Sequence, residues 1–77
     1  MKIQFNIPQN GYKADIKQAI ESGTYDQWVD GKFGARIREL IGDDFSMVIA
    51  ADSFVVDFVN DDDGRTFLAT FGGRTIE

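Results

Sequence analysis

The side chains in this sequence most able to do chemistry are carboxylates. Three of them are consecutive, Asp61-Asp62-Asp63, and they follow Asn60 and precede Gly64. Carboxylate and amide oxygens are cation ligands, but an EF-hand loop needs ligands at alternating positions and a final Glu, and this segment has neither. Asn, Asp and Gly also favour turns for backbone reasons alone. We therefore predict no metal site and interpret residues 60–65 as a solvated turn.

The acidic residues also form a longer one-sided stretch. Between Glu39 and Arg65 there is no Lys or Arg, but there are seven aspartates: Asp43, Asp44, Asp52, Asp57, Asp61, Asp62 and Asp63. Carboxylates spread over a rigid surface compete for Lys and Arg side chains that otherwise bind phosphates. A surface that only keeps the protein soluble is the alternative. If the stretch is functional, we expect five of these residues to meet basic groups of a protein partner: Asp52, Asp57, Asp61, Asp62 and Asp63.

Catalysis has little support in this composition. The chain has no Cys and no His, which removes the common zinc sites and the usual nucleophile pairs. Asp52 and Asp57 are a conceivable acid–base pair, but no nucleophile motif or phosphate-binding glycine loop accompanies them. We predict a protein that is not an enzyme, with no catalytic residues and no cofactor.

Two other groups have candidate roles. Lys32, Arg36 and Arg38 are a weak nucleic-acid signal because no aromatic residues are interleaved with them, so ion pairs are the preferred interpretation. Tyr25 and Trp28 are residue types enriched in binding hot spots, but a single Trp in a small domain is more often core.

The first half of the chain predicts one strand and two helices. Residues 2–7 alternate between polar and apolar types, and Pro8 ends that strand. Helical spacing predicts a helix over 10–22, closed by Gly23. Thr24 and Gln27 fit a capping box, so a second helix begins at Thr24, with a break at Asp30-Gly31 and an amphipathic continuation over 31–41.

The second half predicts strands at 46–51, 54–59 and 66–71. Phe67, Ala69 and Phe71 alternate with Thr66, Leu68 and Thr70, and Gly72-Gly73 stops the run. Residues 74–77 are interpreted as a frayed tail. The order β-α-α-β-β-β predicts a two-layer α+β fold, with an antiparallel C-terminal β-meander packed against two helices. The first strand fits either edge of that sheet.

The 77 residues make one domain, residues 1–77. The N-terminus lacks the apolar run of a signal peptide, and no segment is apolar enough to span a membrane, so we expect a cytoplasmic protein with no membrane contact. The net charge of −5 disfavours direct binding to nucleic acid.

The segment 54–72, with its β-rich run, acidic Asn60–Arg65 turn and short aromatic stretch ending in Gly72, resembles the closing hairpin of small bacteriophage accessory proteins. The resemblance implies a virus-encoded protein that binds and blocks a host protein in the host cytoplasm, as small anti-CRISPR and anti-restriction proteins do. It assigns no functional residue.

Together these observations favour a small acidic, non-enzymatic protein-binding module that acts as an inhibitor or adaptor on a partner with a basic surface. The alternative is a structural or assembly protein that works as a homo-oligomer through its outer sheet face and an edge strand. The sequence leaves the oligomeric state open.

Overall fold

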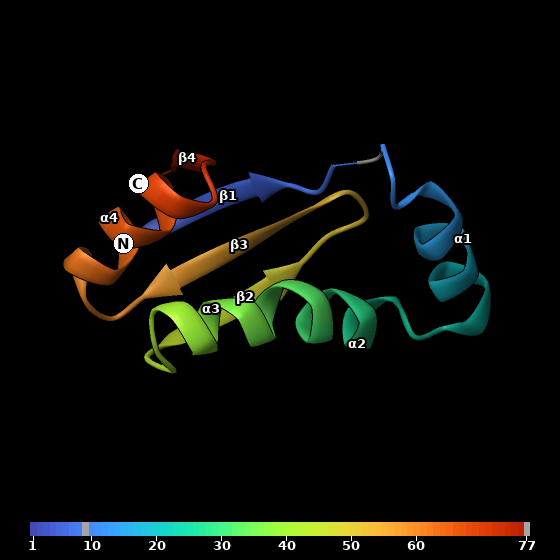
Figure 1. The fold of residues 1–77 in the computed structure, drawn as a ribbon, viewed down its shortest axis with the longest axis horizontal. Coiled ribbons are helices and arrows are strands. Elements are labelled where there is room, and N and C mark those ends of the chain that lie inside the picture. Colours follow the sequence, from blue (N-terminus) through green and yellow to red (C-terminus); the bar gives the residue numbers. More distant parts are fainter. Residues whose placement is uncertain (9, 77) are drawn as a thin grey trace.

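In the computed structural model, which describes residues 1–8 and 10–76, the chain folds into short strands and helices (Figure 1). Their order is β1 (Lys2–Asn6), α1 (Lys13–Ser22), α2 (Tyr25–Val29), the π-helical turn η1 (Asp30–Gly34), α3 (Ala35–Leu40), β2 (Phe45–Ile49), β3 (Ser53–Phe58), α4 (Asp61–Thr70) and β4 (Arg74–Thr75). The predicted α+β class is confirmed.

The strands form one antiparallel sheet in the order β2-β3-β1-β4. The first strand therefore lies inside the sheet, between β3 and β4. Ile3 is opposite Val56 in β3 and opposite Thr75 in β4. The predicted edge position of the first strand is therefore wrong, because Arg74 and Thr75 pair with its other side.

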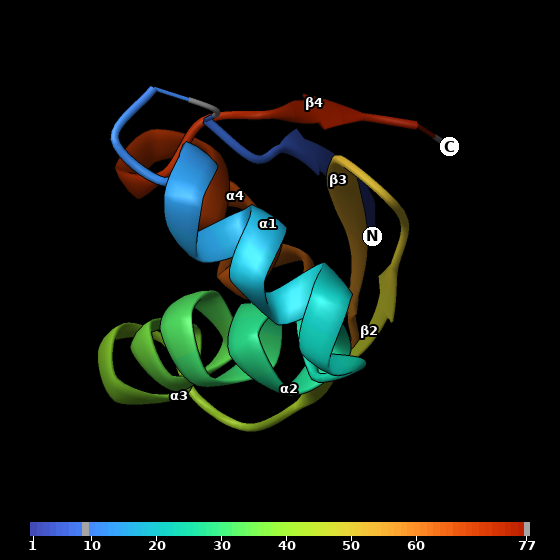
Figure 2. The ribbon, with the colours of Figure 1, turned by 90° about the vertical axis from the view of Figure 1, so that its right-hand side faces the viewer.

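The helices cover one face of the sheet and leave the other open, as Figure 2 shows. The covered face carries the alternating apolar residues of the strands, including Ile3, Phe54, Val56 and Phe58, which are at most 2 % exposed. The open face carries the residues between them, among them Lys2 and Gln4 of β1, Val55 and Asp57 of β3, and Val48 of β2. The molecule is a two-layer structure whose core lies between the sheet and the helices.

The predicted break at Asp30-Gly31 lies where the α-helix gives way to the π-helical turn η1, but the chain stays helical through it. Residues Val29, Phe33 and Ile37 are all buried, and each is four positions from the next. In a regular α-helix a spacing of four drifts by about 40° per step around the axis. The wider π turn reduces this drift and keeps all three side chains facing the sheet. Thr24 does precede the helix as predicted, but its side chain makes no capping hydrogen bond.

The predicted strand at 66–71 is wrong, and the predicted turn at 60–65 begins a helix instead. Asn60 is extended and precedes α4, whose first turn contains Asp61, Asp62 and Asp63. Carboxylates are favoured there because they face the positive end of the helix dipole. The inward residues Gly64, Phe67, Leu68 and Phe71 follow helical spacing, while Ala69 is exposed. Residues 67, 69 and 71 fit a period of two equally well, which explains the error.

The C-terminal β-meander is therefore replaced by a β2–β3 hairpin, helix α4 and a short return strand. The predicted frayed tail is wrong at Arg74 and Thr75, which pair with β1 as β4. Gly73 lies at this junction with a positive φ of 95°, and a Cβ there would come within 2.7 Å of the Gln4 carbonyl oxygen. Glycine permits both the backbone conformation and the close approach.

Candidate functional site: the acidic end

Four of the five predicted site residues lie together, and the fifth does not. Asp57 is near the end of β3, and Asp61, Asp62 and Asp63 follow within one short connection at the start of α4. Asp52 lies in the turn before β3, at the opposite end of that strand. At about 3.3 Å per residue, Asp52 and Asp57 are about 17 Å apart, so they form neither one patch nor an acid–base pair.

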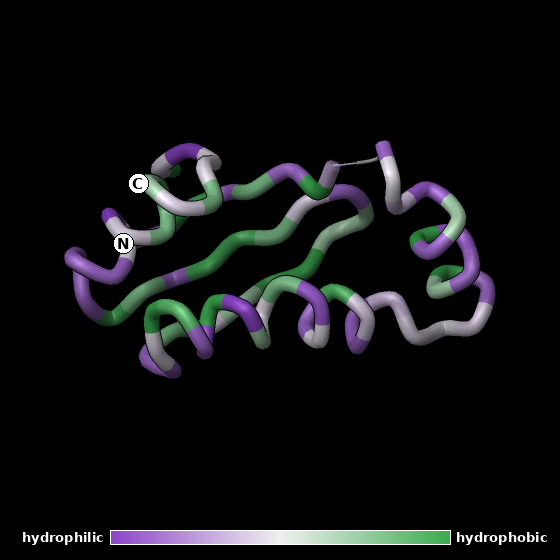
Figure 3. Tube along the Cα trace, viewed as in Figure 1, coloured by the Kyte–Doolittle hydropathy of each residue, from purple (hydrophilic) through white to green (hydrophobic). Residues whose placement is uncertain are grey.

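A second loop brings two further carboxylates to this region. The Val59 N–H donates to the Asp44 carbonyl oxygen at 3.0 Å, which fixes the α3–β2 loop beside the β3–α4 connection. Hydrophilic segments of both loops meet at the same end of the molecule, at the left in Figure 3. We call this region the acidic end. It comprises Asp43, Asp44, Asp57, Asp61, Asp62 and Asp63.

The carboxylates of the acidic end differ in how far they are already neutralised. The Met1 ammonium lies 3.5 Å from Asp57 Oδ1 and 3.9 Å from Asp61 Oδ1. Asp62 accepts a hydrogen bond from Arg65 Nη1 at 2.7 Å, but both side chains are mostly exposed, so this pair contributes little. Across residues 1–8 and 10–76, the exposed side chains of Asp43 and Asp44 have no ion-pair or hydrogen-bond partner.

Asp61, Asp62 and Asp63 also have a structural role that the turn interpretation missed. They occupy the first turn of α4, and Asn60 Nδ2 donates to Asp63 Oδ2 at 3.4 Å. The order Asn-Asp-Asp-Asp ahead of an apolar i, i+3, i+4 pattern is typical of a helix start and was present in the sequence. The start of α4 therefore explains Asp61, Asp62 and Asp63. It does not explain Asp43 and Asp44, which lie in another loop.

Asp52 belongs to a different contact at the other end of the hairpin. The Tyr25 hydroxyl donates to the Ala51 carbonyl oxygen at 2.7 Å and ties α2 to the β2–β3 turn. Burial raises the pKa of Tyr25, and the nearby carboxylates of Asp52 and Asp26 raise that pKa further. Asp52 therefore lies near a tyrosine that joins helix to hairpin, away from the other four predicted site residues.

This contact gives a prediction about alkaline pH. Because the pKa of Tyr25 is higher in the folded chain than its usual value of 10.0, its contribution to stability is complete below that value and disappears as pH rises through the raised pKa. Replacing Tyr25 with Phe should cost about 1 kcal/mol at neutral pH through the lost hydrogen bond. Urea unfolding of both proteins from pH 7 to 11 should show their stabilities converging as Tyr25 ionises. A difference that stays constant would contradict this account.

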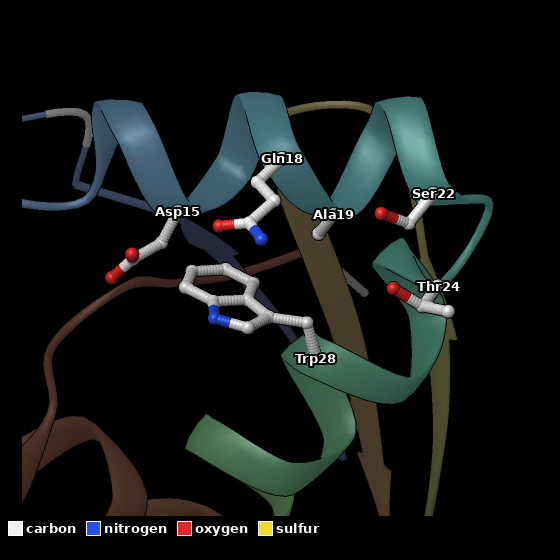
Figure 4. Close-up of a pocket in the computed structure, with 6 residues that line it drawn as sticks. All are labelled: Asp15, Gln18, Ala19, Ser22, Thr24 and Trp28. Carbon is white, nitrogen blue, oxygen red and sulfur yellow. The ribbon is translucent and has the colours of Figure 1, made fainter.

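A hollow of about 330 Å³ is lined by Gln4, Phe5, Asn6, Gly73 and Arg74, and a second hollow lies between α1 and α2. This second hollow is lined by Asp15, Gln18, Ala19, Ser22, Thr24 and Trp28, and Figure 4 shows the Trp28 indole lying beneath α1. Its volume is about 180 Å³, below the roughly 300–1,000 Å³ of typical ligand pockets. The Trp28 and Tyr25 rings stack at 6.2 Å, and both pack against the core, as expected for Trp28.

The three bases of η1 and α3 each have a neighbour within the chain. Arg38 pairs with Asp30 at 2.9 Å, an ion pair of the kind that the sequence predicted. Lys32 lies 5.0 Å from the Tyr12 ring centre and Arg36 lies 5.9 Å from that of Phe71. Each base therefore has its own aromatic or acidic neighbour, which is a structural use of the charge.

Comparison with known proteins yields no relative. No protein-family model matches the chain, and neither a curated protein nor a solved structure matches it. Within the described residues, no three carboxylates are grouped so that they could hold a metal ion. None of the helices in that part of the chain has the length and apolar character needed to cross a membrane.

Proposed function

We propose that this protein is a non-enzymatic protein-binding module, an inhibitor or adaptor, that docks its acidic end on a basic surface of another protein. The observation that carries the proposal is the convergence of the α3–β2 loop and the β3–α4 connection, which places Asp43 and Asp44 beside Asp57 and Asp61. Within the described residues, the exposed side chains of Asp43 and Asp44 have no ion-pair or hydrogen-bond partner. A patch of one sign attracts an oppositely charged partner and accelerates association.

Protein is a better partner than nucleic acid on electrostatic grounds. The net charge is −5, and the helix bases have neighbours within the chain that already use their charge. A phosphate backbone would be repelled by the acidic end, whereas Lys and Arg side chains would be attracted to it. The role that we propose for the carboxylates of the acidic end is attraction of a partner, not catalysis.

An inhibitor of the kind encoded by bacteriophages is the specific form of this proposal that the sequence resemblance favours. The segment that carries the resemblance, residues 54–72, forms strand β3 and helix α4, where a closing hairpin was expected. The proposal therefore takes its structural support from the arrangement of the acids and not from the shape of this segment.

The proposal is tested by comparing what two proteins capture from a bacterial lysate. One is the natural sequence, and the other carries Asp43→Asn, Asp44→Asn and Asp61→Asn, which keep side-chain size and remove charge. We expect the natural protein to retain proteins with basic surfaces at low salt and the variant to lose them. If both proteins capture the same partners equally well, the acidic end is not the binding surface.

A further inference from the structure

Strand β2 is a free edge of the sheet. The strand order β2-β3-β1-β4 places it at one side, with β3 as its only neighbour in the sheet among the described residues. The other edge is the two-residue strand β4, which is too short to guide a further strand. Five-residue β2 is therefore the edge at which an added strand would find the most backbone to pair with.

Two hydrogen bonds at the ends of the β2–β3 pair show which backbone groups of β2 point away from the sheet. Ala50 N–H donates to the Ser53 carbonyl oxygen at 2.8 Å, and Val59 N–H donates to that of Asp44 at 3.0 Å. Alternation along an antiparallel pair then turns the amides of Ser46 and Val48 toward β3. Met47 and Ile49 turn their N–H and carbonyl groups away from the sheet, as a strand-adding ligand requires.

The side chains of β2 do not block the pairing of another strand with this edge. Its sequence, Phe-Ser-Met-Val-Ile, contains no charge and no proline, the two devices that most often block edge pairing. Val48 is 69 % exposed and lies on the open face beside Val55. Phe45, Met47 and Ile49 are half-buried on the other face and leave apolar surface for a neighbouring strand to cover.

The charges at the two ends of β2 indicate what would pair with it. Asp43 and Asp44 come directly before β2, and Asp52 lies in the turn that follows it. Asp57 of β3 lies opposite Ser46, a small residue near the start of β2. A second copy pairing antiparallel would bring Asp43 and Asp44 of one chain toward Asp52 of the other, and like charges repel. An extended segment with Lys or Arg at both ends and β-branched residues between them would find opposite charge at each end.

We propose that β2 binds an extended basic segment of the partner as an added antiparallel strand, continuing the sheet beyond its free edge. The inference rests on the proposed function, since it names the form in which a basic partner binds. Main-chain hydrogen bonds to Met47 and Ile49 supply the pairing, and the acids at the two ends of β2 set the charge preference. Asp52, remote from the acidic end, then has a place in the same interface.

The test uses the peptide Lys-Val-Lys-Val-Thr-Val-Lys and two N-methylated versions of it. When the peptide lies beside β2 with its valine side chains on the same sheet face as Met47 and Ile49, the valine amides point toward β2. Methylating the three valine amides should weaken binding by about tenfold or more, because those donors are lost and the methyl groups clash. Methylating the middle lysine, the threonine and the last lysine should leave binding within about twofold, because those amides point away.

Amide exchange measured by NMR gives a second readout in the protein itself. On binding, the amides of Met47 and Ile49 should exchange more slowly, while those of Ser46 and Val48, already bonded to β3, serve as internal references. Equal binding by both methylated peptides, with no new protection, would overturn strand addition and leave the proposed function standing. No binding of any version at low salt would overturn the inference, and the lysate comparison would then decide the proposed function separately. Protection of Met47 and Ile49 in the protein without peptide, rising with its concentration, would assign the edge to a second copy instead.

Discussion

Replacing Phe67 with alanine is expected to lower the free energy of unfolding by about 3–5 kcal/mol, the usual cost of emptying a buried aromatic site. Phe67 is fully buried, and its ring lies within 6.5 Å of those of Phe5, Phe54, Phe58 and Phe71, measured between centres. It is the main apolar anchor of α4 on the sheet. The loss would take most of the stability of a domain this small.

Urea unfolding, followed by Trp28 fluorescence and by far-ultraviolet circular dichroism, measures this loss. Thr70→Ala, at an exposed position at the end of the same helix, is the matched control and should change stability by less than about 0.5 kcal/mol. If the alanine variant is already unfolded in water, Phe67→Leu should still unfold cooperatively with a smaller loss. A loss below about 1 kcal/mol for Phe67→Ala would contradict the packing of α4 described above.

Neutralising the acidic end is expected to slow association with a captured basic partner by about tenfold at low salt. The variant is Asp43→Asn, Asp44→Asn and Asp61→Asn, and the reason is the loss of long-range attraction before contact. At about 0.5 M salt the screening length falls to a few ångströms, so the natural and variant rates should converge. Stopped-flow measurement of the association rate across salt concentrations checks both expectations. A rate difference that does not shrink with salt would indicate a lost contact instead of lost attraction.

The alternating sequence patterns of β1 and β3 made these strands predictable. Helix α4 was not predictable, because its apolar residues fit both a strand period and a helix period. Ile3 and Ile7 alternate with polar residues and are buried as predicted. Phe54, Val56 and Phe58 alternate with Val55, Asp57 and Val59 and are also buried. Gly23 was predictable as the end of a helix, since its φ of 70° suits glycine. In α4, by contrast, Phe67 belongs to a strand pattern and a helix pattern at once, and the acidic residues before it serve a turn and a helix start equally well.

The candidate site was predictable in its residue types and not in its grouping. That Asp52 and Asp57 lie apart follows from the length of the predicted strand between them, because consecutive strand residues advance the chain by about 3.3 Å. That Asp43 and Asp44 join Asp57 and Asp61 depends on the pairing of β2 with β3 and on the bond from Val59 to Asp44. The free edge of β2 depends in turn on β1 entering the sheet between β3 and β4, a long-range pairing with no local signal.

The association rate of two variants with identical net charge tests the central claim most directly. One carries the three changes at the acidic end, and the other carries Asp15→Asn, Glu21→Gln and Asp26→Asn on the exposed surfaces of α1 and α2. Both lose three negative charges, so a general effect of net charge slows them equally. We expect that at low salt only the acidic-end variant loses about tenfold in association rate. Equal slowing of both, or slowing of the α1–α2 variant alone, would contradict docking through the acidic end.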